Sequence, residues 1–239
     1  MGYPKVTHCI FDMDGLLLDT EAIYTVAQKE ILAKFGKEFT WALKAKMMGK
    51  KALDAARVLV AETGLEGVLD PEDFIRQREE ILDRLFPDAP MMPGAERLIR
   101  HLHASGVPIA VATSSHARHF DIKTRKHRDV FGLFDHIVTG DQVTHGKPAP
   151  DIFLVAAGGF GPGRGPASAA HCLVFEDAPV GVEAAVAAGM PAVFVPDPNL
   201  DADGVAGAAA VLPSLEAFDP AEWGLPPYPG SAGAGAVRN

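Results

Sequence analysis

The chain has 239 residues, of which 48% are apolar and 22% charged, a balance that is ordinary for globular proteins and argues against disorder. With 22 Lys and Arg against 31 Asp and Glu, its formal net charge is −9, so nucleic acids and anionic membrane surfaces would repel it. No apolar run is long enough to span a membrane, and we expect a cytoplasmic protein with neither kind of partner.

Six short apolar runs, each ending in polar residues, Gly or Pro, predict strands. They are residues 6–11, 107–112, 136–139, 172–175, 192–195 and 209–212. Segments of helical character lie between most of them, such as 95–104, which Gly106 stops, and 178–188, which Gly189 stops. Strands that alternate with helices are typical of a parallel, doubly wound α/β sheet.

The region between the first two predicted strands contains no strand candidate. From about residue 21 to residue 90, apolar side chains repeat only at helical spacings, as Leu53, Ala56 and Val60 do. This pattern predicts a helical insertion. We expect a discontinuous α/β core domain of residues 1–19 and 91–239, and a helical cap domain of residues 20–90.

Two acidic pairs follow predicted strands directly. Asp12 and Asp14 follow the first strand, and Glu176 and Asp177 follow the fourth. Ligands of open α/β sheets bind beyond the carboxyl ends of the strands, so both pairs belong where a site would form. Neighbouring carboxylates repel one another, and a hard cation such as Mg²⁺ relieves that repulsion. Taken singly, the first pair could be a solvated turn, and Asp177 could merely cap the next helix.

Two further elements suit a phosphate group. Thr113 ends the second predicted strand, and its hydroxyl, with the backbone N–H groups that follow, could hold a phosphate or simply cap a helix. Lys147 lies between Gly146 and Pro148, which restrict its loop, although a single loop lysine is usually solvated. One fold can bring all four elements to one edge of one sheet, and we therefore favour a shared site.

The four elements, in this order, resemble the motifs of the haloacid dehalogenase superfamily over nearly the whole chain. The superfamily's motifs match Asp12-Met13-Asp14-Gly15, Thr113, Lys147 and Glu176-Asp177. The resemblance implies a Rossmann-like sheet with a cap inserted after the first motif. It also implies Mg²⁺-dependent hydrolysis of a small phosphomonoester through an aspartyl-phosphate.

Roles follow from this resemblance and from the chemistry of carboxylates. Asp12 is the expected nucleophile and Asp14 the acid and base, because a carboxylate nucleophile divides ester hydrolysis into two steps. Mg²⁺ would be held by Asp12, the backbone carbonyl of Asp14 and Asp177, with Glu176 acting through a metal-bound water. The phosphate would be bound by Thr113, Ser114 and Lys147.

Other activities of the superfamily are weighed by single positions. Its ion-pumping ATPases have Thr where Asp14 stands, so Asp14 indicates a phosphatase or phosphomutase. The similar β-phosphoglucomutases have His where Tyr24 stands, which favours the phosphatase. A binding module without activity is the third alternative, and the intact set of motif residues argues against it.

The cap is expected to choose the substrate. We expect Gly49 and Lys50 on a loop over the site, with Glu21 and Lys50 touching the substrate, although the nearby lysines could equally form a solvated helix face. Stretches 43–48, 109–113, 121–128 and 222–227 resemble plant glycerol-3-phosphatases. Stretches 48–53 and 145–148 resemble animal pseudouridine-5′-phosphatases, as do Ser114 and Lys50. Either substrate is possible, glycerol 3-phosphate is favoured, and a mobile cap suggests a monomer.

Overall fold

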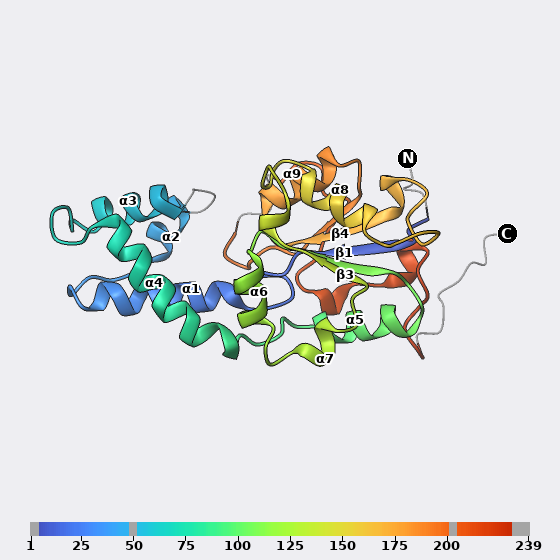
Figure 1. Cartoon of the computed structure of the whole chain (residues 1–239), viewed down its shortest axis with the longest axis horizontal. Coiled ribbons are helices and arrows are strands. Elements are labelled where there is room, and N and C mark those ends of the chain that lie inside the picture. The colour runs from blue at the N-terminus through green and yellow to red at the C-terminus, as the bar shows by residue number, and fades with distance from the viewer. Residues whose placement is uncertain (1–4, 48–51, 201–204, 231–239) are drawn as a thin grey trace. The chain divides into compact units, whose positions relative to one another are not determined.

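The computed structural model describes residues 5–47, 52–200 and 205–230. It divides into two compact units, shown in Figure 1: Met1–Leu18 with Met91–Asn239, called here the sheet unit, and Asp19–Pro90, called the helical unit. The chain leaves and re-enters the sheet unit at one place, because Leu18 forms an antiparallel bridge with Met91. Directly beside this bridge the N–H of Asp19 donates to the carbonyl of Pro90 at 2.9 Å.

The sheet unit is built on a six-stranded parallel sheet in the order β3-β2-β1-β4-β5-β6. The strands are β1 (His8–Phe11), β2 (Ile109–Ala112), β3 (His136–Val138), β4 (Cys172–Glu176), β5 (Ala192–Phe194) and β6 (Ala210–Val211). Each overlaps a predicted run, and the doubly wound α/β fold is confirmed. From the central strand β1 the chain builds the sheet first toward β3 and later toward β6. The carboxyl end of β1 is therefore the switch point at which such sheets bind ligands.

Helices cover both faces of this sheet (Figure 1). On one face lie α8 (Asp151–Gly158) and α9 (Pro179–Ala187), and on the other α5 (Ala95–Ala104) and α7 (Arg128–Phe131). Alternation along β1 sends Ile10 into the cluster that contains Phe153 of α8, while Phe11 stacks on Phe175 of β4 at a centroid distance of 4.6 Å. Close packing on both faces fixes the strand ends in space.

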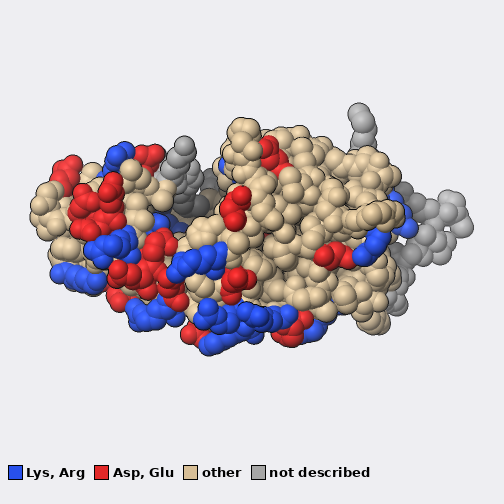
Figure 2. All heavy atoms as spheres, viewed as in Figure 1, with Lys and Arg blue, Asp and Glu red and all other residues tan. Residues whose placement is uncertain are grey.

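The helical unit consists of α1 (Thr20–Ala33), α2 (Trp41–Met47), α3 (Ala52–Glu62) and α4 (Pro71–Leu85), with no strand among its described residues. The predicted apolar face is buried at Ala56 and Val60. Helix α4 begins where Asp70 accepts hydrogen bonds from two backbone N–H groups. Figure 2 shows charges of both signs over this unit. Arg76 of α4, for example, pairs with Asp73 and Glu80.

Two segments with little regular structure are anchored within the sheet unit by side-chain contacts. In the loop after α8, the Arg164 carbonyl accepts from His8 Nε2 at 2.6 Å, and its guanidinium pairs with Asp135 at 2.7 Å. After the short helix Pro220–Trp223, Leu225 is buried and the carbonyl of Pro226 accepts from the His101 ring on α5. Among the described residues, no helix is both long enough and apolar enough to cross a membrane.

Candidate active site

The carboxyl ends of β1, β2 and β4 meet at one edge of the sheet unit. Asp12 follows β1, Thr113 follows β2, and Glu176 ends β4. Backbone hydrogen bonds extend the sheet into this edge: the N–H of Asp12 donates to Phe175 at 3.0 Å, and that of Thr113 to Val138 at 3.0 Å. The parallel register thus brings together side chains that lie up to 164 positions apart in the sequence.

Lys147 links all three of these strand ends. Its Nζ donates to Asp12 Oδ1 at 2.5 Å, to Glu176 Oε1 at 2.6 Å and to the carbonyl of Ala112 at 3.2 Å. The side chains of Lys147, Asp12 and Glu176 are only 6%, 8% and 1% exposed. Charges this deeply buried are tolerated only when they are paired and hydrogen-bonded, so the three groups depend on one another.

The same burial changes the protonation of this group of residues. Loss of hydration raises the pKa of Asp12, and the ammonium of Lys147 opposes that rise. Burial alone would lower the pKa of Lys147, but the carboxylates of Asp12 and Glu176 raise it above its ordinary value. The ammonium therefore remains charged and favours the carboxylate form of Asp12, which is the form that can attack an electrophile.

An acidic cluster lies beside this pair. Carboxylate oxygens of Asp12, Glu176 and Asp177 lie within 4.8 Å of one another, a set of hard oxygen donors that fits a divalent cation such as Mg²⁺. Glu176 is already engaged, because its Oε2 accepts from the N–H groups of Asp177 and Ala178 at 3.1 Å each. Asp12 and Asp177 are therefore the better direct ligands, and Glu176 fits a role at one remove.

Gly15 makes room for this cluster. Its φ of +82° lies in the left-handed region, and a Cβ there would stand 2.2 Å from Asp177 Oδ2. Only glycine gives the turn after β1 both this conformation and this close approach. The position matches the glycine of the Asp12-Met13-Asp14-Gly15 run.

Asp14 lies beside the same edge and is held by three donors. Oδ1 accepts from Lys123 Nζ at 2.6 Å, while Oδ2 accepts from Ser115 Oγ at 2.8 Å and from Thr113 Oγ1 at 3.3 Å. The N–H of Ser115 in turn donates to Thr113 Oγ1 at 3.0 Å. The exposed Ser114 belongs to the same turn after β2. The structure therefore gathers Asp12, Asp14, Thr113, Ser114, Lys147, Glu176 and Asp177 at one edge.

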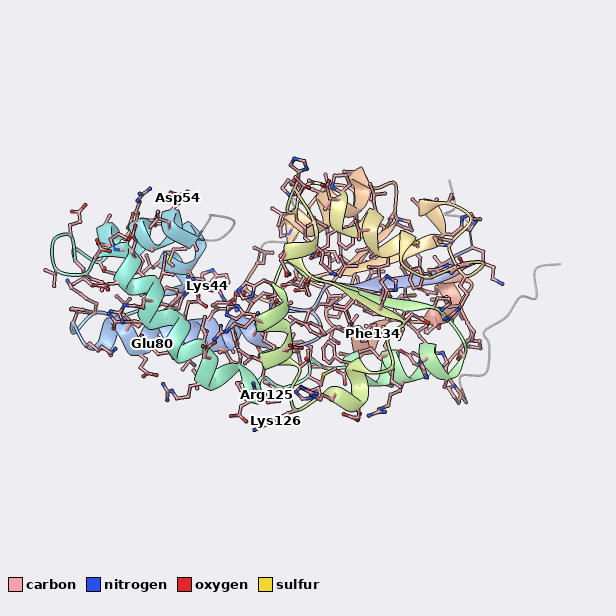
Figure 3. The ribbon with its side chains drawn as sticks, viewed as in Figure 1. Lys44, Asp54, Glu80, Arg125, Lys126 and Phe134 are labelled. Atoms are coloured by element: carbon pink, nitrogen blue, oxygen red, sulfur yellow. The ribbon has the colours of Figure 1, made fainter. Side chains whose placement is uncertain are left out.

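Of the three residues expected to face the substrate from the cap, the structure describes Glu21 alone. Glu21 lies on α1 and accepts from Lys44 of α2 at 2.9 Å within the helical unit, where Figure 3 labels Lys44. Gly49 and Lys50 lie outside the described residues. Tyr24, which replaces the histidine of the mutases, packs edge-to-face on Phe86 at a centroid distance of 5.5 Å.

Sequence reasoning missed Ser115 and Lys123. Ser115 is the second serine after Thr113, and nothing in the sequence separates it from Ser114. Lys123 belongs to a basic stretch whose composition is typical of a solvated segment, but it lies three residues after Phe120 and four after His119. That spacing places Lys123 on the inner face of α6 (Ala117–Lys123). The spacing is the one feature of the sequence that could have predicted the burial of this lysine.

A parallel sheet whose carboxyl edge holds a buried carboxylate–lysine pair and an acidic cluster is typical of an α/β enzyme. Sequence comparison gives the class its name. Residues 6–189 match the model of the haloacid dehalogenase-like hydrolases, and the chain belongs to this family. Within it, the chain is a hydrolase of phosphoric monoesters.

Proteins similar to this chain include two that are named as phosphatases of small molecules. The chain is 54% identical to (DL)-glycerol-3-phosphatase 2 of Arabidopsis thaliana over 95% of each chain. It is 49% identical to a Drosophila melanogaster protein named "Probable pseudouridine-5'-phosphatase", over 94% of this chain and 96% of the other. A solved haloacid dehalogenase family hydrolase of Deinococcus radiodurans, with bound phosphate and sodium, is 28% identical with a TM-score of 0.75, covering 93% and 99%.

The mutual dependence of the buried charges predicts the effect of removing the lysine. Lys147→Met leaves two carboxylates without their ammonium, so the free energy of unfolding, measured with urea in EDTA, should fall by about 3–5 kcal/mol. Adding Glu176→Gln should recover part of that loss, because it removes one of the two charges. Lys126→Met, on an exposed loop, should change stability by less than about 0.5 kcal/mol. A Lys147→Met protein as stable as the parent would contradict this account.

Proposed function

We propose that the protein is a Mg²⁺-dependent phosphatase of a small phosphorylated metabolite, acting through an aspartyl-phosphate on Asp12. The observation that supports this most strongly is the contact of Lys147 Nζ with both Asp12 and Glu176, beside Asp177. It provides a carboxylate aligned by an ammonium, next to oxygen ligands for a cation. These are the parts that phosphoryl transfer to a carboxylate requires.

In the first step an oxygen of the Asp12 carboxylate attacks phosphorus. The bond between phosphorus and the leaving oxygen breaks, and its electron pair stays on that oxygen. Asp14 gives its proton to the same oxygen, so the leaving group departs as an alcohol. Lys147 holds Asp12 Oδ1, which keeps the nucleophile in one orientation.

In the second step water attacks the phosphorus of the aspartyl-phosphate. Asp14, now a carboxylate, takes a proton from that water as the bond between Asp12 and phosphorus breaks. Inorganic phosphate leaves, Asp12 returns as a carboxylate, and Asp14 is again protonated. One residue therefore serves as acid and then as base, and both steps balance in atoms and protons.

A divalent cation is proposed from the charges of the site. Three carboxylates, those of Asp12, Glu176 and Asp177, face one ammonium, and a phosphate ester would add further negative charge. Asp12, the backbone carbonyl of Asp14 and Asp177 would hold the ion, with Glu176 acting through a water molecule. When bound, Mg²⁺ neutralises charge on the phosphoryl oxygens.

Phosphate binding is assigned to the turn after β2 and to Lys147. The hydroxyl of Thr113 and the N–H of Ser114 would bind phosphoryl oxygens, because both belong to the turn that connects β2 to α6. Lys147 would contact the same oxygens from its position beside Asp12. Residues 20–90 would act as the cap domain, and residues 1–19 and 91–239 as the core domain.

Glycerol 3-phosphate is the substrate we favour. Support comes from the 54% identity with the Arabidopsis glycerol-3-phosphatase, compared with 49% for the Drosophila relative. Pseudouridine 5′-phosphate is the second candidate. Glu21, Gly49 and Lys50 are the proposed contacts with the leaving group, and Glu21 would be presented by its ion pair with Lys44. A monomeric, cytoplasmic enzyme remains our prediction.

Metal removal tests the proposed cation. EDTA should abolish phosphate release, and added Mg²⁺ should restore it, with Asp12→Asn as the inactive reference. Gly15→Ala should raise the Mg²⁺ concentration for half-maximal activity by about tenfold or more, because its Cβ would displace Asp177. Gly106→Ala is the matched control, since Gly106 has a φ of +71° and open space around it. Full activity in chelated, metal-free protein would refute the metal assignment.

A phosphate-release panel tests the substrate. It compares kcat/KM for glycerol 3-phosphate, pseudouridine 5′-phosphate, FMN, 2-deoxy-sugar phosphates, β-glucose 1-phosphate and p-nitrophenyl phosphate. We expect glycerol 3-phosphate to rank first. Pseudouridine 5′-phosphate in first place would establish the second candidate, and isomerisation of β-glucose 1-phosphate without phosphate release would indicate a mutase. If no metabolite exceeds p-nitrophenyl phosphate, the substrate proposal is wrong.

A further inference from the structure

A second lysine of the sheet unit is completely buried. The side chain of Lys123, at the end of α6, has an exposed fraction of 0%. Arg125 and Lys126, which follow it directly, are exposed, and Figure 3 labels both on the loop after α6. Removing an ammonium from water is unfavourable unless acceptors replace the lost hydration. The environment of Lys123 must therefore provide them, and the steps proposed so far do not use this residue.

The acceptors are a carboxylate oxygen of Asp14 and the hydroxyl oxygen of Ser115. Lys123 Nζ donates to Asp14 Oδ1 at 2.6 Å and to Ser115 Oγ at 2.9 Å, and Ser115 Oγ donates to Asp14 Oδ2 at 2.8 Å. The three groups close a triangle in which each oxygen of the carboxyl group has its own donor. Thr113 Oγ1 is a further donor to Oδ2 at 3.3 Å. Rotation of the carboxyl group about its last bond would break these hydrogen bonds together.

The triangle is anchored on three separate elements. Asp14 follows β1, Ser115 belongs to the turn after β2, and Lys123 lies in the last turn of α6 beside the buried Ile122. The side chain of Asp14 keeps 22% of its surface exposed, so its donors hold it from within while part of it stays accessible. A catalytic acid needs this combination of a fixed position and an open side.

We propose that Lys123, together with Ser115, is the positioning residue for the acid and base Asp14. This inference rests on the proposed function, in which Asp14 protonates the leaving oxygen. Lys123 touches neither the phosphate nor the leaving group in this account. It acts by keeping the carboxyl group of Asp14 where proton transfer occurs as the bond from phosphorus to the leaving oxygen breaks.

The leaving group provides a test that separates this role from a structural one. An alkoxide must be protonated as it leaves, whereas p-nitrophenolate can leave without a proton. Glycerol 3-phosphate and pseudouridine 5′-phosphate both release alcohols, so the test does not depend on which is the natural substrate. The parameter kcat/KM reports the first irreversible step, which is the transfer to Asp12. If Asp14 is held in the wrong position, kcat/KM should therefore fall more for alkyl phosphates than for p-nitrophenyl phosphate.

The experiment compares full-length Lys123→Met with the parent on the better alkyl phosphate and on p-nitrophenyl phosphate, in Mg²⁺. We expect kcat/KM for the alkyl phosphate to fall at least about tenfold more than that for p-nitrophenyl phosphate. Ser115→Ala, which removes a single hydroxyl group, should show the same bias more weakly and protects the test if Lys123→Met does not fold. Lys126→Met, on the exposed loop, should show none.

Asp14→Asn separates a failure of the role proposed for Lys123 from a failure of the role proposed for Asp14. It should show the largest bias, and adding Lys123→Met to it should change the ratio between the substrates by less than about twofold, because the residues act as one unit. Equal losses on both substrates for Lys123→Met and Ser115→Ala, with bias in Asp14→Asn, would overturn the role of Lys123 alone. Absence of bias in Asp14→Asn would overturn the role of Asp14 and this inference together.

Discussion

The buried ammonium of Lys147 between the carboxylates of Asp12 and Glu176 is the contact on which the rest of the site depends. Each of these charges would be unfavourable alone in so dry a place, and together they satisfy one another at 2.5 and 2.6 Å. The contact requires β1 and β4 to be neighbours in register and the loop after β3 to return to them. The order of the strands therefore matters for the site as well as for the core.

Two buried lysines each form an ion pair with one of the two aspartates that follow β1. In our proposal Lys147 aligns the nucleophile Asp12, and Lys123 fixes the proton donor Asp14. Asp12 and Asp14 are separated by one residue, yet they have separate ammonium partners from different elements. Because neither aspartate relies on the partner of the other, each can be held for its own step.

Much of the fold and the site could be predicted from residue patterns. The strands of the parallel sheet are continuous apolar runs, even at the partly exposed edge strand β6, so each overlaps a predicted run. The acids and Thr113 that follow or end three of them indicated the edge where they meet. Lys123 was missed because its burial depends on how α6 packs, which local composition does not reveal. The engagement of Glu176 Oε1 likewise depends on Lys147, which lies 29 positions earlier, whereas Oε2 accepts from the neighbouring backbone N–H groups. Gly49 and Lys50 stay predictions.

The central claim is that Asp12 becomes phosphorylated during turnover. Rapid mixing of the Mg²⁺-loaded enzyme with substrate, followed by an acid quench and mass spectrometry of its peptides, measures this directly. The account predicts a phosphoryl group on the peptide that contains Asp12, formed no later than the alcohol product and absent from Asp12→Asn. Alcohol release without any phosphorylated peptide, or a phosphoryl group on another residue, would contradict it.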